Sequence, residues 1–257
     1  MARDGLRAWL IRSGLDGAAR GIRHPLLTLR SGAARRWAKS AFRSTEEVAR
    51  AIDPVLWDET TAFASALESR HRARFQELRA SIRLGGGGDH RLLYFLTRLT
   101  RPTVVVETGV AAGWSSAAIL AAMHRNGHGH LWSSELVYDR PWLHDDYLPF
   151  VGMVVDPALH DRWTLLLDGD RANLPAILDA SGPIDLFHFD SDKSLEGRRF
   201  AFELVQPNLA REAVVVVDDI NDNLHFRRLA ASSRVPFAVT GTRGTVGLIW
   251  SGLPAPG

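Results

Sequence analysis

Five short apolar runs that alternate with helix-like stretches dominate the second half of the chain. The runs are Val104–Glu107, Leu131–Glu135, Trp163–Leu167, Ile184–Asp190 and Val214–Val217. Helix-like sequence follows each of the first four, and this alternation is typical of a parallel sheet with helices on both faces. Two further runs, 236–240 and 245–250, are separated by a turn too short for a parallel crossover, so they predict an antiparallel hairpin. We therefore predict an α/β fold with a doubly wound, mostly parallel sheet.

The residues before position 89 have a different character. Ser44-Thr45-Glu46-Glu47 has capping-box spacing and predicts a helix start, and Asp53-Pro54 predicts a second one. Apolar residues then recur at helical spacing up to Leu84, where the four glycines 85–88 interrupt the pattern. We predict an N-terminal basic and helical region over residues 1–88 and a second domain over residues 89–257.

The start of the chain is basic. Ten basic and two acidic residues precede position 44, although the net charge of the whole chain is only +2. Glycines and Pro25 interrupt this segment, so we expect short helical pieces rather than one helix. Residues 1–43 are candidates for a peripheral membrane contact, for a substrate lid or for a contact in a homo-oligomer, and packing on the rest of the protein is the simpler alternative. Nucleic-acid binding is not expected, because stacking aromatic residues are not interleaved with the basic ones.

The composition excludes several classes of site. The chain has no cysteine, so disulfides, thiolate metal sites and cysteine nucleophiles are excluded. No apolar run approaches the roughly 20 residues that a membrane-spanning helix needs. The first residues also lack the apolar block of a signal peptide. These features favour a cytoplasmic location.

Residues that end the predicted strands are the first site candidates, because open α/β sheets bind ligands beyond the carboxyl ends of their strands. The first run leads into the segment 107–116, Glu-Thr-Gly-Val-Ala-Ala-Gly-Trp-Ser-Ser. Gly109 and Gly113 allow a tight turn and a close approach to a ligand. Ser115 and Ser116 stand where the next helix begins, and the backbone amides of a helix start favour an anionic group.

Two acids follow the next two runs. Glu135 lies 22 positions after Gly113, close to the offset at which an acid binds ribose hydroxyls in nucleotide-binding units. Asp170 follows the third run and is placed to reach an adenine amino group, or to cap the helix that begins there. Together these residues predict a nucleotide-like ligand at this end of the sheet.

The fourth and fifth runs end in clustered acids. Asp190-Ser191-Asp192-Lys193 follows the fourth, and Asp218-Asp219 follows the fifth. If the two strands are neighbours, their backbones lie about 4.8 Å apart, so that Asp190, Asp218 and Asp219 share one small volume. Carboxylates so close together repel one another unless a cation is present, and an all-oxygen cluster suits Mg²⁺. Helix capping by Asp219 and an ion pair between Asp192 and Lys193 are the alternatives.

These motifs resemble a known enzyme family. The segment 107–116 is similar to the first motif of class I S-adenosylmethionine-dependent methyltransferases. The acids at 190–193 and 218–219 resemble the metal-dependent O-methyltransferase branch, which includes the caffeoyl-CoA and catechol enzymes and the macrolide and aminocoumarin sugar O-methyltransferases. The resemblance covers residues 89 to 250 and implies a seven-stranded sheet with an antiparallel last strand.

The resemblance also implies roles for single residues. Cofactor-binding residues would be Glu107, Gly109, Gly113, Ser115, Ser116, Glu135, Asp170 and Asp190, and metal ligands would be Asp190, Asp218 and Asp219. Plant and animal members have asparagine where Asp219 stands, whereas the sugar-modifying members resemble this chain there. This difference favours a hydroxyl of a sugar or natural product as the small-molecule acceptor.

The expected reaction needs an activated acceptor hydroxyl. Mg²⁺ would lower the pKa of this hydroxyl and orient it. Asp192 or Lys193 would then take the proton, and Asp192 is the first choice because a lysine in an acidic cluster stays charged. His225 is a more distant candidate. Alternatives are methyl transfer without a metal, or a non-catalytic protein that binds the cofactor or a membrane surface.

Overall fold

A seven-stranded sheet forms the centre of the molecule. The structure, a computed structural model, describes residues 25–79, 88–135, 147–241 and 245–254. The strands are β1 (Val104–Thr108), β2 (His130–Ser134), β3 (Trp163–Leu166), β4 (Ile184–Phe189), β5 (Leu209–Val217), β6 (Phe237–Thr240) and β7 (Val246–Ile249). They lie in the order β3-β2-β1-β4-β5-β7-β6. Neighbours from β3 to β5 are parallel, and β7 is antiparallel to both β5 and β6. The predicted sheet and its terminal hairpin are confirmed.

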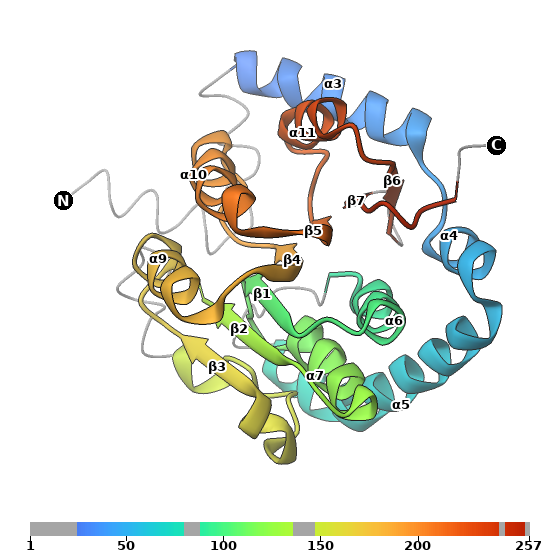
Figure 1. Cartoon of the computed structure of the whole chain (residues 1–257), viewed down its shortest axis with the longest axis vertical. Helices are drawn as coiled ribbons and strands as arrows, with labels where there is room; N and C mark the ends of the chain where they lie inside the picture. The colour runs from blue at the N-terminus through green and yellow to red at the C-terminus, as the bar shows by residue number, and fades with distance from the viewer. Residues whose placement is uncertain (1–24, 80–87, 136–146, 242–244, 255–257) are drawn as a thin grey trace.

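Helices cover both faces of this sheet (Figure 1). One face carries α4 (Thr45–Ile52), α5 (Pro54–Arg79), α6 (His90–Thr100) and α7 (Trp114–Asn126). The other carries α3 (Pro25–Ala41), α9 (Asp170–Ser181), α10 (Leu195–Val205) and α11 (His225–Ser233). Successive strand residues serve opposite faces, as Val105 packs in the first core and Val106 in the second. Burial on both faces explains why these strands read as mainly apolar runs without strict alternation of apolar and polar residues.

The connection from β2 to β3 is described in part. Residues 136–146 lie outside the described residues, so the helical content expected after β2 stays a prediction. The described part contains two 3₁₀ turns, Leu148–Phe150 and Pro157–Arg162. Between them Gly152 has φ 73°, a left-handed conformation that separates the two turns.

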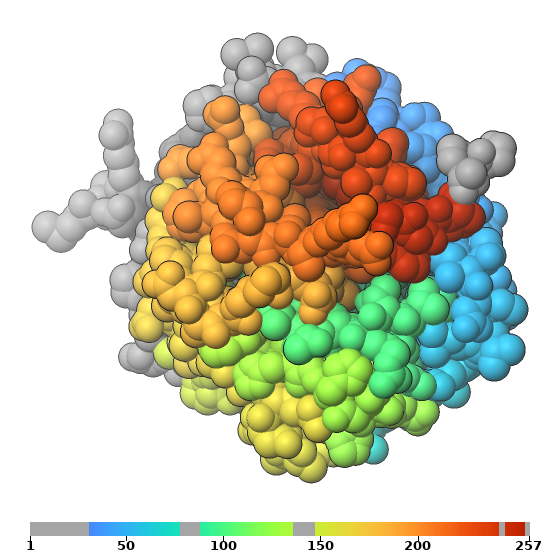
Figure 2. All heavy atoms as spheres, viewed as in Figure 1, coloured from blue at the N-terminus to red at the C-terminus, as the bar shows by residue number. Residues whose placement is uncertain are grey.

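The N-terminal helices belong to the same core as the sheet. Val48 of α4 and Trp57 of α5 are buried in one cluster with Leu92 of α6. The amide of Arg43 donates to the carbonyl of Val239, and the Thr45 hydroxyl bonds to Asp89. Figure 2 shows these blue segments lying against the red C-terminal strands along one side of the molecule. The predicted domain boundary after residue 88 is not tested by this packing and stays a prediction.

The expected helix starts are observed, with one difference. Ser44 forms both bonds of the capping box, and α5 begins at Pro54. Within the basic segment, residues 25–41 form one helix of 17 residues, because Pro25 stands at its first position, where proline starts a helix instead of breaking it. Residues 1–24 and the predicted helical and glycine-rich stretch 80–87 lie outside the described residues. No helix in the described ranges is both long and apolar enough to cross a membrane.

The capping box gives a stability prediction. In Ser44→Ala the Glu47 amide loses its acceptor, so we expect urea unfolding to report about 1 kcal/mol less stability. Ser40→Ala is the control, because the exposed Ser40 hydroxyl only donates to the Trp37 carbonyl within its own helix. We expect the control to change stability by less than about 0.5 kcal/mol. Equal losses in the two variants would contradict the role of the cap.

Candidate active site

The loop after β1 passes directly against the end of β4. A Cβ atom added to Gly109 would overlap the carbonyl oxygen of Asp190, and Gly109 has φ 82°. At Gly113, φ is 87° and an added Cβ would lie 2.8 Å from the Cα of Gly152. Only glycine both adopts a positive φ without strain and leaves the space that a Cβ atom would fill at these positions. The two glycines predicted to line the cofactor therefore also allow the loop to pack closely on neighbouring backbone.

Glu135 holds this loop from the end of β2. Its Oε2 accepts hydrogen bonds from the amides of Val110, at 2.7 Å, and Ala111, at 2.8 Å. Its Oε1 accepts one from the Tyr147 hydroxyl at 3.0 Å. Burial raises the pKa of Glu135, and the two amides oppose this shift. Because a carboxylate oxygen accepts two hydrogen bonds, Oε1 has capacity for one further donor, such as a ribose hydroxyl.

Asp170 connects the ends of two strands through its hydrogen bonds. It is the first residue of α9, whose N-cap is Gly169, so the alternative prediction of an N-cap role at Asp170 is wrong. Its carboxylate accepts hydrogen bonds from the Ser134 hydroxyl, at 2.6 Å, and from the Ser191 hydroxyl. Burial raises the pKa of Asp170, and the two serines oppose this shift. Asp170 thus joins the ends of β2 and β4 where an adenine is predicted to bind.

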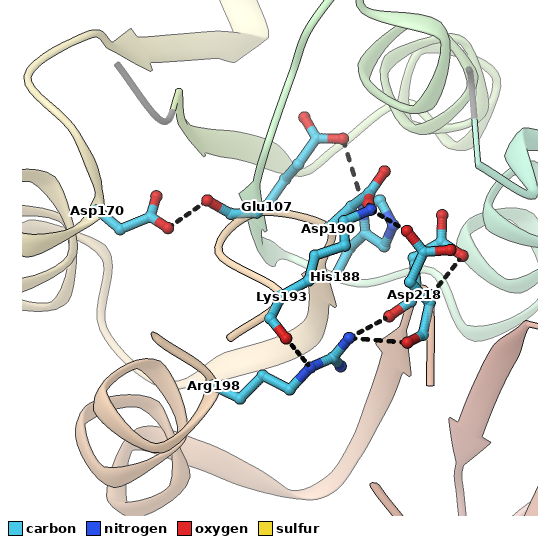
Figure 3. Close-up of polar contacts among 9 residues, drawn as sticks. Glu107, Asp170, His188, Asp190, Lys193, Arg198 and Asp218 are labelled. Carbon is cyan, nitrogen blue, oxygen red and sulfur yellow. Dashed lines mark hydrogen bonds and ion pairs between the residues drawn. The ribbon is translucent and has the colours of Figure 1, made fainter. Parts of the chain in front are cut away.

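Glu107 points into the protein interior. Its side chain is fully buried, and its Oε2 accepts hydrogen bonds from Ser116, at 2.6 Å, and Ser133, at 2.9 Å. The imidazole Nδ1 of His188 lies 3.4 Å from Oε1 (Figure 3). Burial alone would raise the pKa of Glu107, but His188 outweighs this effect and lowers it. The cofactor roles of Glu107 and Ser116 stay predictions, and their bonds in the described structure are internal.

The three predicted metal ligands lie at adjoining strand ends. Asp190 follows β4 and Asp218 follows β5, and these strands pair in parallel register. The ammonium of Lys193 lies 2.6 Å from Asp190 Oδ1 and also contacts Asp219 Oδ2 (Figure 3). Burial would lower the pKa of Lys193, but the charges of Asp190 and Asp219 outweigh it and raise the pKa. Lys193 therefore stays protonated as the cation of this cluster.

Asp218 is the most buried member of the cluster. It is 8% exposed, and its Oδ1 accepts the amide of Asp219 at 2.9 Å. Burial, with the charges of Asp190 and Asp219, raises the pKa of Asp218 to about 7. Gly88, just before α6, lies close by, since its added Cβ would be 3.1 Å from Asp218 Oδ2 and 3.8 Å from Asp190 Oδ2. A segment before the sheet thus closes one side of the cluster.

The acidic trio offers oxygen donors of the kind that a divalent cation needs. In the described arrangement no three acidic or imidazole side chains are close enough together to hold a metal ion. The chemistry of the set fits nevertheless, because it offers oxygen atoms only and already holds one cation, the Lys193 ammonium, on two carboxylates. Asp190, Asp218 and Asp219 are the residues that would hold a metal here.

The two other proton-acceptor candidates have separate surroundings. The Asp192 carboxylate accepts the Ser194 amide at 3.0 Å, and an added Cβ at Gly197 would overlap it, so Asp192 packs on the start of α10. Burial lowers the pKa of His225 to about 4, and its ring lies 5.1 Å from that of Phe202. Neither side chain bonds to the acidic trio in the described structure.

Sequence reasoning missed two contributors to the site. Arg198 of α10 donates to backbone carbonyls that follow both strands, and Gly88 lies beside Asp218. Arg198 is followed by a second arginine in an amphipathic stretch, so no local pattern distinguishes it.

Comparison with known proteins supplies a family match and a fold likeness. Residues 106–220 match a family model described as a methyltransferase domain. No curated protein sequence matches the chain significantly. Cofactor-bound Rv0187 from MTB is 16% identical with a TM-score of 0.50, over 75% of this chain and 90% of that chain. A methyltransferase from Geobacter sulfurreducens is 21% identical with a TM-score of 0.49, over 72% and 87% of the two chains. At these identities the likeness concerns the fold alone.

The raised pKa of Asp218 predicts a pH-dependent stability. Below the ordinary carboxyl pKa both the folded and unfolded states hold the proton, whereas above about pH 7 the folded state carries the cost of a buried charge. We therefore expect the melting temperature of Asp218→Asn to exceed that of the wild-type protein by a margin that grows as pH rises from 4 to 8, measured in buffers with EDTA. Asp179→Asn, at an exposed position of α9, is the control and should show a constant difference. A melting-temperature difference that is constant with pH for Asp218→Asn as well would contradict the raised pKa of Asp218.

Proposed function

We propose that this chain, an S-adenosylmethionine-dependent methyltransferase by its matched domain and its sheet order, methylates a hydroxyl oxygen of a sugar or natural product. The observation that carries the proposal is the contact between the loop at Gly109 and the backbone of Asp190. The loop predicted to bind the methyl donor and the cluster predicted to bind the acceptor therefore adjoin. A methyl group transferred in line needs this short separation.

The chain's own groups suit an acceptor that loses a proton. A hydroxyl is a poor nucleophile until its proton leaves, and negative charge then develops on its oxygen. Lys193 keeps its proton, so it offers a fixed positive charge beside that oxygen. Among the trio, Asp218 has a pKa near neutrality and is placed to accept a proton when no metal is bound. Asp192, the first choice from the sequence, stays a prediction.

The more specific part of the proposal is that the reaction uses a divalent cation. Mg²⁺ held by Asp190, Asp218 and Asp219 would supply Lewis-acid activation of the acceptor hydroxyl. The Lys193 ammonium contacts Asp190 and Asp219 but not Asp218, which leaves the Asp218 carboxyl group available to a further cation. The second candidate function is methyl transfer without a metal, and it is favoured by the position of Lys193 on two of the three carboxylates. The class of acceptor is part of this proposal. Membrane contact through residues 1–43 and a homo-oligomer stay predictions.

Cofactor binding is tested at Glu135. In Glu135→Gln the side-chain oxygen still accepts the loop amides, but the charge that would receive ribose hydroxyls is lost. We expect calorimetry to show S-adenosylmethionine binding about tenfold weaker or more, as for the loss of a hydrogen bond to a charged group. Glu212→Gln, exposed on β5, should bind like the wild type. Unchanged affinity in Glu135→Gln would remove Glu135 from the cofactor site.

Metal dependence is tested by chelation and by direct binding. Formation of S-adenosylhomocysteine with a panel of sugar and natural-product alcohols should stop in EDTA and return with Mg²⁺. Titration with Mn²⁺ alone should show affinity at least about tenfold lower in Asp190→Asn, which lacks one charged ligand, and unchanged affinity in Asp179→Asn. Full activity in EDTA, with equal Mn²⁺ affinity in the two variants, would establish the metal-free alternative instead.

A further inference from the structure

Arg198 is a buried cation beneath the acidic cluster. It lies on α10 and is 1% exposed. One of its terminal nitrogens, Nη2, donates to the carbonyl oxygens of Asp218, at 3.0 Å, and Asp219, at 2.9 Å (Figure 3). Its Nε donates to the carbonyl of Lys193 at 3.4 Å. A single side chain thus joins the backbone that follows β4 to the backbone that follows β5.

This arrangement is costly. Burial lowers the pKa of Arg198, and in the described structure the guanidinium forms no ion pair with a carboxylate. Its second terminal nitrogen, Nη1, is buried and has no hydrogen-bond partner. A buried charge without a direct counter-ion destabilises a fold unless something else requires it. In this site, the requirement comes from the backbone carbonyls, which accept their hydrogen bonds from Arg198.

The turn at Asp219 shows what the contact holds. Asp219 has φ 49°, a left-handed conformation that is uncommon for a residue with a side chain. Such a conformation persists where the surroundings fix it. The Asp219 carbonyl accepts hydrogen bonds from Arg198 and from the amide of Asp222, at 3.1 Å. This turn sets the direction of the Asp219 carboxylate toward Lys193.

The segment after β4 is held in the same way. The carbonyl of Lys193 accepts Arg198 Nε and also the side-chain amide of Asn223, at 3.0 Å. Asn223 lies in the segment between β5 and α11, so its bond connects the two strand ends directly, whereas Arg198 connects them through its Nε bond to Lys193 and its Nη2 bonds to Asp218 and Asp219. The backbone of Lys193 is therefore fixed relative to Asp218 and Asp219, and its ammonium reaches Asp190 and Asp219 from that fixed point.

We propose that Arg198 is a positioning residue, which holds the backbone of Asp218, Asp219 and Lys193 together so that the Lys193 ammonium stays on its two carboxylates. The proposal rests on the proposed function for its link to methyl transfer. The positioning itself does not require cofactor or acceptor. It assigns to α10 a part in the site that the strand-end residues alone do not reveal.

The lysine content of the chain provides a direct test. Lys39 and Lys193 are the only lysines, and Lys39 is exposed on α3. Reductive methylation in EDTA, followed by mass spectrometry of chymotryptic peptides, gives the ratio of Lys193 to Lys39 modification. In the wild type the ratio should be low, because the Lys193 ammonium is bound to two carboxylates. In Arg198→Met it should rise at least about tenfold, since charge-assisted hydrogen bonds that fix the segment are lost.

The control variant is Arg199→Met, which removes an exposed arginine next to Arg198 on the same helix and should leave the ratio unchanged. Arg198→Gln retains a side-chain donor and should give an intermediate ratio. If Arg198→Met does not fold, the ratio in Arg198→Gln tests the positioning role instead. An unchanged ratio in a folded Arg198 variant overturns the proposal. An equal rise at both lysines overturns it too, because it indicates general loosening.

A catalytic measurement then links the position to the reaction. With an active acceptor, Arg198→Met should lower kcat at least about tenfold and leave the KM for S-adenosylmethionine unchanged, as expected when only the reacting groups are misplaced. Equal changes in both constants would overturn the link. Absence of activity in the wild type would refute the proposed function, while the lysine ratio would still decide the role of Arg198.

Discussion

The parallel register between β4 and β5 determines the geometry of the acidic end of the sheet. Phe189 pairs with Val217, and the Asp218 amide continues the ladder by donating to the Phe189 carbonyl at 2.9 Å. Since paired strands lie about 4.8 Å apart, the residues that follow them must share one volume. Asp190 and Asp218 are those residues. The charge of Asp190 adds to burial in raising the pKa of Asp218, and Lys193 supplies a cation from the chain itself that bonds to Asp190.

The sequence predicted the strands well because burial on both faces leaves a clear signal. The run from Val104 is apolar up to Glu107, and the run from Ile184 lacks the strict polar alternation of a surface strand, although it contains Asp185 and His188. Strand ends also predicted which acids meet, because topology alone places them. Glu107 shows the limit of this reasoning. It ends a strand, yet its direction depends on His188 and Ser133, which come from other strands and cannot be paired by local pattern.

The glycines of the loop after β1 show how one signal serves two constraints. A glycine at position 109 is required by the passage of the loop over Asp190, and the same passage brings the loop to the acidic cluster. A pattern associated with a cofactor is thus also a packing requirement. Asp192 shows the reverse case, since its neighbours in sequence suggested a base, while its bond to the Ser194 amide follows from the start of α10.

The two cations near the trio differ in how far each can be replaced. Lys193 carries a point charge on a flexible stem and its side chain is 33% exposed, so another cation can compete for its carboxylates. Arg198 is buried and bonds to backbone carbonyls through a planar fork, so its place depends on shape as much as on charge. The chain therefore separates a fixed scaffold from an exchangeable charge. Under the proposed function, either the Lys193 ammonium or a metal would meet the same fixed backbone, so the two alternatives differ in the cation and not in the arrangement of the aspartates.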